Sequence, residues 1–350
     1  MKKIISIIVA VMLIAGSLSA CSNKQNSDNK QDSQSVSNNS VTKKLKIVTT
    51  IFPEYDWVRT IVGENADQLD LTMLLDNGVD LHSYQPSIDD ILKISTCDMF
   101  IYVGGESDKW VDDALAQATN KDMVVIDLLD ILGDKVKNEE IVEGMEHEHE
   151  DEDEDHDHEE DHDHDEDHEH EEELDEHVWL SLNNAGIICD KITESLKKLD
   201  SANADLYQSN LNSYKEKLSS LDAQYKTAVN ESAVKTLLFG DRFPFRYMTD
   251  DYGLSYYAAF TGCSAETEAS FETVIFLANK INEYGLKSIL TIEGSDKKIA
   301  ETIRNNTNTK DQKILTLNSM QGITSTDISN GVTYLSVMTD NLNILKDALN

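Results

Sequence analysis

The sequence predicts an α/β protein with two lobes of parallel sheet, joined by a long helical segment. Three observations support this fold class. Short apolar, β-branched runs alternate with helical stretches on either side of the middle of the chain, which is typical of parallel sheets. Residues 183–229 are almost wholly helix-forming and contain no proline. The length of 350 residues is enough for about two domains.

The first 44 residues predict export and attachment to a membrane. Lys2 and Lys3 precede a short apolar run and the small residues "GSLSAC", the pattern of a secretory signal over residues 1–20, too short for a membrane span. The end of this run resembles the lipobox of bacterial lipoproteins, which implies cleavage before Cys21 and lipidation of its sulfur. A plain secretory signal with a chance cysteine is the alternative. Residues 21–44 then predict a lipidated cysteine and a flexible polar tether.

The first lobe is predicted over residues 45–185. Three apolar runs have the pattern of buried strands, and stretches between them have helical spacing. Ser87 is the expected N-cap of the first of these helices. The predicted strands cover residues 45–52, 98–105 and 123–129, and the predicted helices cover residues 87–95 and 107–119.

The second lobe is predicted over residues 233–350, after a linking helical segment at residues 186–232. The whole helix-forming stretch is long for a globular helix, so the sequence leaves open one long helix or two helices joined near residues 201–204. The predicted strands of the second lobe cover residues 234–240, 254–260, 286–294 and 312–318, with helices between them.

An acidic, His-rich tract at residues 144–176 interrupts the first lobe. Residues 146–176 contain 22 Asp and Glu residues and no Lys or Arg, so they account for most of the net charge of −36. Such a tract cannot pack a core, which predicts a disordered loop. Its imidazoles suit weak, accessory metal binding, while a solvated loop without a metal role is the alternative. The predicted accessory ligands are His147, His149, His156, His158, His162, His164, His168 and His170.

Two histidines stand in a different context. His82 follows turn signals and precedes the helix that Ser87 begins, so it is expected on a loop after a strand, where sheets of this class bind ligands. His177 ends the tract, and the apolar residues "VWL" that follow indicate that the chain re-enters the core. Taken singly, each histidine is better explained by a structural role than as a ligand, but their joint context favours a metal site.

Five segments, in chain order, carry a resemblance to a known family: "TTIFPEYDWVRTIVG", "LHSYQPSIDDILKISTCDMFIYVGG", "DEHVWLSLNNA", "GCSAETEAS" and "TIEGS". They resemble the metal-binding lipoproteins of bacterial ABC uptake transporters, of the zinc and manganese type. The acidic His-rich loop before "DEHVWL" is similar to that of the zinc members. The resemblance implies two α/β lobes joined by a rigid helix, with a metal held in the cleft between them.

The resemblance also implies a ligand set. His82, His177 and Glu293 match family ligand segments, but the position of the remaining ligand falls on Arg242, whose guanidinium stays protonated and cannot bind a metal. Asp241 is therefore the expected fourth ligand. The alternatives are that Asp241 caps the following helix and water or a histidine of the tract completes the site, or that Arg242 pairs with Glu293. Two nitrogens and two carboxylates suit Zn²⁺, and also Mn²⁺.

The predicted function is capture of a divalent metal, above all zinc, and its delivery to the permease of an ABC importer, without catalysis. The protein is expected to be a monomer, lipid-anchored on the extracytoplasmic face of the cell membrane. A manganese-specific protein of the same family and a stand-alone extracellular zinc buffer or sensor are the alternatives. A secreted metalloenzyme is disfavoured because neither H-E-x-x-H nor G-x-S-x-G occurs. The sequence has no dense basic patch that would indicate nucleic-acid binding.

Three further cysteines have no motif spacing. Cys97, Cys189 and Cys263 are scattered, which predicts small buried side chains rather than a zinc motif or a disulfide framework. The sequence does not decide whether two of them form a disulfide.

Overall fold

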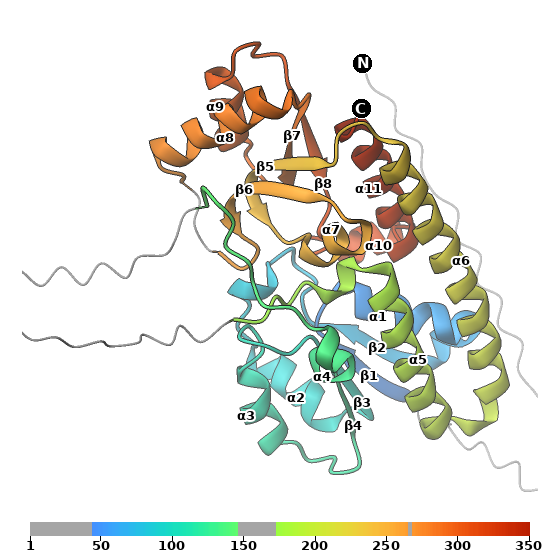
Figure 1. Cartoon of the computed structure of the whole chain (residues 1–350). Coiled ribbons are helices and arrows are strands. Elements are labelled where there is room, and N and C mark those ends of the chain that lie inside the picture. Colours follow the sequence, from blue (N-terminus) through green and yellow to red (C-terminus); the bar gives the residue numbers. More distant parts are fainter. Residues whose placement is uncertain (1–43, 146–172, 265–267) are drawn as a thin grey trace, which may run out of the picture. The chain divides into compact units, whose positions relative to one another are not determined.

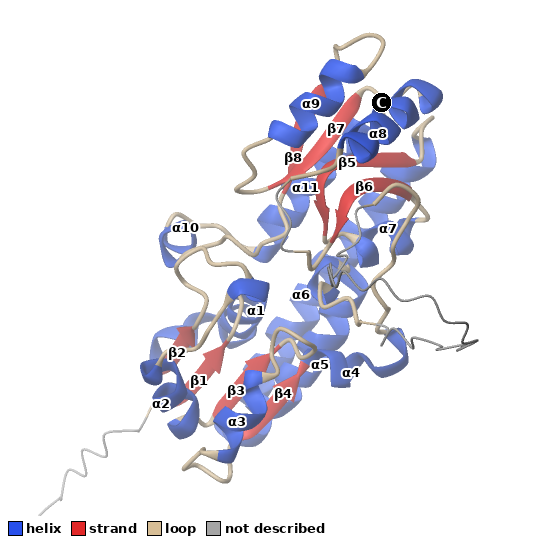
Figure 2. Cartoon of the chain, turned by 90° about the vertical axis from the view of Figure 1, so that its left-hand side faces the viewer, coloured by secondary structure: helices blue, strands red, loops and turns tan. Residues whose placement is uncertain are grey.

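Two four-stranded sheets organise the residues that this computed structural model describes, which are 44–145, 173–264 and 268–350. All strand pairs in both sheets are parallel, and helices surround each sheet (Figure 1, Figure 2). The predicted α/β class with two parallel sheets is therefore confirmed. Among the described residues, no helix is both long and apolar enough to cross a membrane.

The first sheet has the strand order β2-β1-β3-β4. Three of its strands fall within the predicted apolar runs, whereas β2 was not predicted. Ser87 caps α2 as expected, because its hydroxyl accepts the backbone N–H of Asp90. The elements are β1 (Leu45–Thr49), α1 (Phe52–Val62), β2 (Leu69–Met73), α2 (Ile88–Thr96), β3 (Met99–Tyr102), α3 (Trp110–Ala116), β4 (Val124–Asp127) and α4 (Leu128–Leu132).

The second sheet has the strand order β6-β5-β7-β8, and all four strands lie where the sequence predicts strands. Helices α8 and α9 pack against each other beside β5. The elements are β5 (Thr236–Phe243), α7 (Arg246–Tyr252), β6 (Ser255–Thr261), α8 (Phe271–Tyr284), β7 (Ser288–Ile292), α9 (Lys298–Asn306), β8 (Lys313–Leu317), α10 (Ser325–Ser329) and α11 (Tyr334–Ala348).

Strand β5 is longer than predicted. It does not end at Gly240 but continues to Phe243, and its register against β6 shifts within this stretch. The buried ring of Phe243 stacks on Tyr256 with 3.6 Å between the ring centroids, which holds the extra residues in the sheet. Gly240 serves a close approach rather than a sharp turn, because a Cβ there would lie 2.7 Å from the Cα of Ala300 in α9.

The helical segment between the lobes consists of two helices, α5 (Leu182–Leu199) and α6 (Ala204–Glu231), separated by the 3₁₀ turn Ser201–Asn203. Helix α6 packs against α1 and α5 near its first end and against α11 near its last end (Figure 1). Its buried face repeats every three or four residues, as an amphipathic helix requires. These residues are Tyr207, Leu211, Tyr214, Leu218, Leu221, Tyr225 and Val229.

A continuous apolar core joins the two lobes behind the site. Trp57 and Tyr334 are fully buried and meet edge to face, with ring centroids 5.2 Å apart. The Tyr334 hydroxyl donates to the carbonyl of Trp179, and the Trp179 indole donates to the carbonyl of Ser319. Because these contacts link α1, α11 and the segment after His177, they fix the start of α5 against both lobes. The exact domain boundaries at residues 185 and 233 stay predictions.

Candidate metal centre

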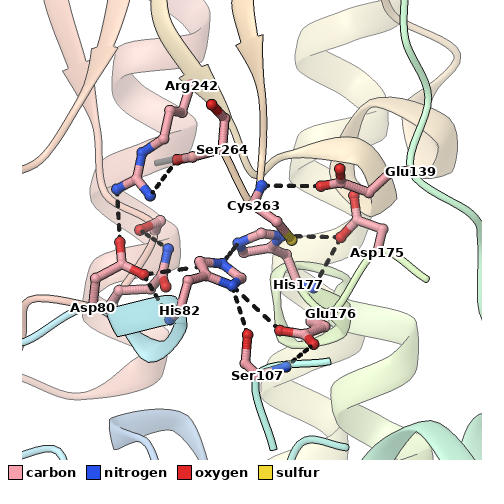
Figure 3. A network of polar contacts seen from close by, with 12 residues as sticks. Asp80, His82, Ser107, Glu139, Asp175, Glu176, His177, Arg242, Cys263 and Ser264 are labelled. Carbon is pink, nitrogen blue, oxygen red and sulfur yellow. Dashed lines mark hydrogen bonds and ion pairs between the residues drawn. The ribbon is translucent and has the colours of Figure 1, made fainter. Parts of the chain in front are cut away.

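His82 lies on the short 3₁₀ turn Leu81–Ser83, in the connection between β2 and α2. The Asp80 carboxylate caps this turn by accepting the backbone N–H of His82 at 3.1 Å. The ring Nδ1 is 2.8 Å from the Ser107 hydroxyl and 3.4 Å from a carboxylate oxygen of Glu176. These acceptors assign the ring proton to Nδ1, which leaves the Nε2 lone pair directed into the site (Figure 3).

His177 is fully buried and directly precedes the 3₁₀ turn Val178–Leu180. One oxygen of Asp175 accepts both its backbone N–H at 2.9 Å and its ring Nδ1–H at 3.0 Å. Burial by itself lowers the pKa of His177, but the Asp175 carboxylate outweighs it and the net shift is upward. This carboxylate–histidine pair fixes the ring orientation and leaves Nε2 as the free atom.

The two histidines face each other through their free nitrogens. The Nε2 atoms of His82 and His177 are 3.2 Å apart, and the ring centroids are 5.1 Å apart. Because both protons are held at Nδ1, two lone pairs point at one another, which is unfavourable unless a cation or a proton lies between them. The sequence-based pairing of these histidines is thus reproduced in space.

Cys263 completes a cluster that the sequence reasoning missed. Among the described residues, one ligand atom each of His82, His177 and Cys263 lies within 4.8 Å of the others; we call this trio the ligand cluster. Gly262 permits the approach, because a Cβ there would lie 2.9 Å from Cε1 of His177. Burial, reinforced by the carboxylate of Glu139, raises the pKa of the Cys263 thiol, so it is neutral without a cation.

A signal for Cys263 was present in the sequence. The segment "GCSAETEAS" is part of the family resemblance, and it begins two residues after the end of a predicted strand of the second lobe. The carboxyl ends of parallel strands are where ligands bind in this class of sheet. The prediction of small buried side chains is confirmed for Cys97 and Cys189, whereas Cys263 is only partly buried, and none of the three forms a disulfide.

The two predicted carboxylate ligands lie outside the ligand cluster. The Asp241 carboxylate accepts the backbone N–H groups of Arg242 at 2.9 Å and of Ile292 at 3.3 Å. The Glu293 carboxylate accepts the backbone N–H and the hydroxyl of Ser319, each at 2.7 Å, and the N–H of Gln321 at 3.1 Å. Their assignment as metal ligands stays a prediction.

The two alternative contacts expected for Asp241 and Arg242 are wrong. Asp241 does not cap the following helix, because α7 has Phe245 at its N-cap position. Arg242 does not pair with Glu293 but with Asp80, across 2.6 Å between Nη2 and Oδ2. Burial by itself raises the pKa of Asp80, but Arg242 outweighs it and the net shift is downward. The same carboxyl group therefore caps the turn that carries His82 and binds the second lobe.

A cavity of about 810 Å³ separates the lobes at this point. Asp80 and Ser83 line it from the first lobe, and Asp241, Arg242 and Glu293 line it from the second. The predicted carboxylate ligands therefore face a cleft that Asp80 and Ser83, on either side of His82 in the chain, also line. The eight accessory histidines of the tract and Cys21 lie outside the described residues. The last two residues of the tract, Asp175 and Glu176, are buried and hold the rings of the histidines.

Fold and site together are those of a metal-binding protein with two α/β lobes, with a cluster of candidate ligands where the lobes meet. The chain belongs to the family described as the zinc-uptake complex component A, periplasmic, whose profile matches residues 47–348. That description names a component of an uptake complex and not a class of enzyme.

Curated relatives agree with this family. The chain is 29% identical to the high-affinity zinc uptake system protein ZnuA of Bacillus subtilis over 343 residues, which cover 98% of this chain and 96% of that protein. It is 30% identical to the zinc-binding protein AdcA of Streptococcus pyogenes over 303 residues, which cover 87% of this chain. The match spans only about half of that AdcA, 56% of its length.

Solved structures show the same fold. The Zn(II)-bound ZnuA-like domain of Streptococcus pneumoniae AdcA has a TM-score of 0.65 and 25% identity, covering 87% of this chain and 99% of that one. The metal-dependent lipoprotein YcdH of Bacillus subtilis has a TM-score of 0.67 and 26% identity over the same shares of the two chains.

Proposed function

We propose that this protein captures zinc outside the membrane and delivers it unchanged to the permease of an ABC importer. The observation that carries the proposal is the pair of imidazoles whose Nε2 atoms lie 3.2 Å apart, both left free by carboxylates at Nδ1. Neutral imidazole nitrogens are favoured zinc ligands, and their carboxylate partners raise ligand basicity. The names of relatives in two genera, zinc-binding in Streptococcus and zinc uptake in Bacillus, support zinc as the cargo.

Selective capture requires that metal binding and release depend on how the two lobes are arranged. His82 and His177 come from segments before the linking helices, whereas Asp241 and Glu293 lie on the second lobe and line the cleft. A metal held from both sides favours the closed arrangement of the lobes, and a partner that recognises this arrangement distinguishes loaded from empty protein. Binding and release of an ion in this way need no catalytic step.

The anchor, the partner and the tract belong to the same proposal. A lipid on Cys21 would hold the protein monomer at the extracytoplasmic face, and "zinc-binding lipoprotein" is the name of an AdcA of Streptococcus pneumoniae that is 29% identical over 350 residues. Cys21→Ser should release the protein from membranes, which cell fractionation measures; unchanged attachment would count against the anchor. The eight tract histidines would act as weak, accessory zinc ligands.

The test of zinc capture is a calorimetric titration of the full chain, purified without added metal, beside His82→Ala. We expect wild type to show one tight zinc site, and His82→Ala to lose about 3 kcal/mol or more, roughly one ligand's share of a typical structural zinc site. His168→Ala, which removes a histidine of the tract, is the matched control and should keep the tight site. Equal tight binding by wild type and His82→Ala would refute the assignment.

A further inference from the structure

Cys263 occupies a position at the metal centre that no ligand prediction included. We propose that its thiolate is the third protein ligand of the bound metal, beside His82 and His177, and that it makes the site favour zinc over manganese. This inference rests on the proposed function, since it assumes that the two histidines bind a divalent metal.

The geometry brings Cys263 to the histidines from a different part of the chain. Its sulfur and the ring nitrogens of His82 and His177 all lie within 4.8 Å of one another. Figure 3 shows the sulfur beside the His177 ring. The backbone N–H of Cys263 donates to Glu139 at 2.9 Å, which fixes this segment against the chain that precedes the acidic tract.

The other two cysteines provide an internal comparison. Cys97 and Cys189 are fully buried members of the main apolar core, as expected for cysteines that act as small hydrophobic side chains. Cys263 is absent from both apolar clusters of the described residues and is only partly buried. Packing therefore accounts for Cys97 and Cys189 but gives no reason for a thiol at position 263.

Arg242 explains how the second lobe presents this thiol. The resemblance places a ligand at its position, but the guanidinium instead donates to the carbonyl of Ser264 at 3.3 Å and to Asp80 at 2.6 Å. Arg242 thus holds the residue next to Cys263 and ties it to the cap of the His82 turn. The second lobe contains no histidine, so its soft ligand for this cluster is the sulfur.

The chemistry of the trio favours zinc. On binding, the thiol releases its proton to the solvent and a zinc–thiolate bond forms, with no change in oxidation state. Two imidazoles and one thiolate suit zinc, which leaves a fourth position for a carboxylate or water, whereas manganese prefers oxygen ligands. The thiolate would therefore raise zinc affinity without raising manganese affinity to the same degree.

Cobalt(II) provides a direct readout, because a thiolate ligand gives it a sulfur-to-metal charge-transfer band in the near ultraviolet. The full chain carrying Cys21→Ser would receive one equivalent of cobalt(II) in a weak chelating buffer, so that only the tight site fills. We expect the band in this protein, its loss with Cys263→Ser, and its retention with Cys97→Ser as the matched control. Tight cobalt binding without the band, or a band that survives Cys263→Ser, would overturn the proposal.

A competition titration separates this inference from the proposed function. Cys263→Ser should weaken zinc binding by more than about 100-fold, beyond the loss typical of groups that only position ligands, and lower the zinc-to-manganese preference. If Cys263→Ser keeps wild-type affinity and preference while His82→Ala loses zinc, the thiolate ligand is excluded and zinc capture stands. If neither substitution weakens binding, both proposals fail.

A measurement on the wild-type chain guards against a variant that does not fold. Zinc should protect Cys263 from alkylation by iodoacetamide, read peptide by peptide by mass spectrometry, and removal of zinc with a chelator should expose it. Equal alkylation of Cys263 with and without one bound zinc would contradict ligation by its sulfur.

Discussion

The two lobes bring different kinds of groups to the candidate metal centre. His82 and His177, which precede the linking helices, have free Nε2 atoms because Ser107 and Glu176 lie at Nδ1 of His82 and Asp175 accepts from Nδ1 of His177. Asp241 and Glu293 of the second lobe have carboxylates that already accept backbone N–H groups. Side chains of ligand type are thus not all equally ready to bind a metal. The hydrogen bonds that their ligand atoms already make decide how readily each one binds.

The largest effect is expected from His177→Ala. His177 is fully buried, and its loss removes a ligand and leaves Asp175 with a buried charge that has lost its ring partner. We expect zinc affinity to fall by about 3 kcal/mol or more, and the metal-free protein to melt at a lower temperature. Competition titration and calorimetric melting measure the two effects. Unchanged zinc affinity would contradict the view that the histidines contribute more to metal binding than the carboxylates of the second lobe.

A smaller effect is expected from Glu293→Gln. To bind zinc, the carboxylate must give up hydrogen bonds from Ser319 and Gln321, each worth about 1.5–3 kcal/mol when the acceptor is charged, and this cost offsets much of the metal–ligand gain. We expect zinc affinity to fall only about tenfold, or about 1.4 kcal/mol. Glu301→Gln, on the exposed face of α9, is the control and should have no effect. A loss of zinc affinity as large as that of His177→Ala would mean that the two lobes contribute equally to zinc binding.

The smallest effect on metal binding is expected from Asp56→Asn, in the apolar core that joins the two lobes. Burial raises the pKa of Asp56 from 3.8 to about 6, although its carboxylate accepts the N–H of Tyr334. Since the folded-state pKa is the higher one, this group stabilises the fold fully below about pH 4, and the contribution is lost as the pH rises through about 6.

Melting of the metal-free protein between pH 4 and 7 tests this sign. Asp56→Asn should remove one component of the decline in melting temperature with rising pH and leave zinc affinity unchanged. The exposed Asp70→Asn is the matched control and should melt with the wild-type pH profile. An identical pH profile for Asp56→Asn and wild type would contradict the prediction.

Local sequence pattern predicted most of the fold. Seven of the eight strands of the described residues coincide with apolar runs, because buried parallel strands require such runs. Strand β2 was not predicted because "LDLTM" mixes polar with apolar residues and lies at the edge of its sheet. The choice between one linking helix and two depended on the turn at Ser201–Asn203, which contains neither glycine nor proline.

The candidate metal centre was predictable only where its signal in the sequence was local. The residues around His82 and His177 in the sequence indicated that each could be a ligand, and the family resemblance assigned both to one metal site. The contact between Asp80 and Arg242 joins residues 162 positions apart, and no local pattern contains such a pairing. Cys263 is likewise brought to the histidines by the packing of the second lobe, and the sequence shows only that it follows a strand.

The ion pair between Arg242 and Asp80 makes separation of the lobes sensitive to ionic strength. Its side chains are 20% and 23% exposed, so dissolved salt reaches the pair and weakens its attraction. Any movement that parts the lobes at this point must break the pair, and the same carboxylate also caps the turn under His82. The energy needed to separate the lobes at this point therefore falls as the surrounding salt concentration rises.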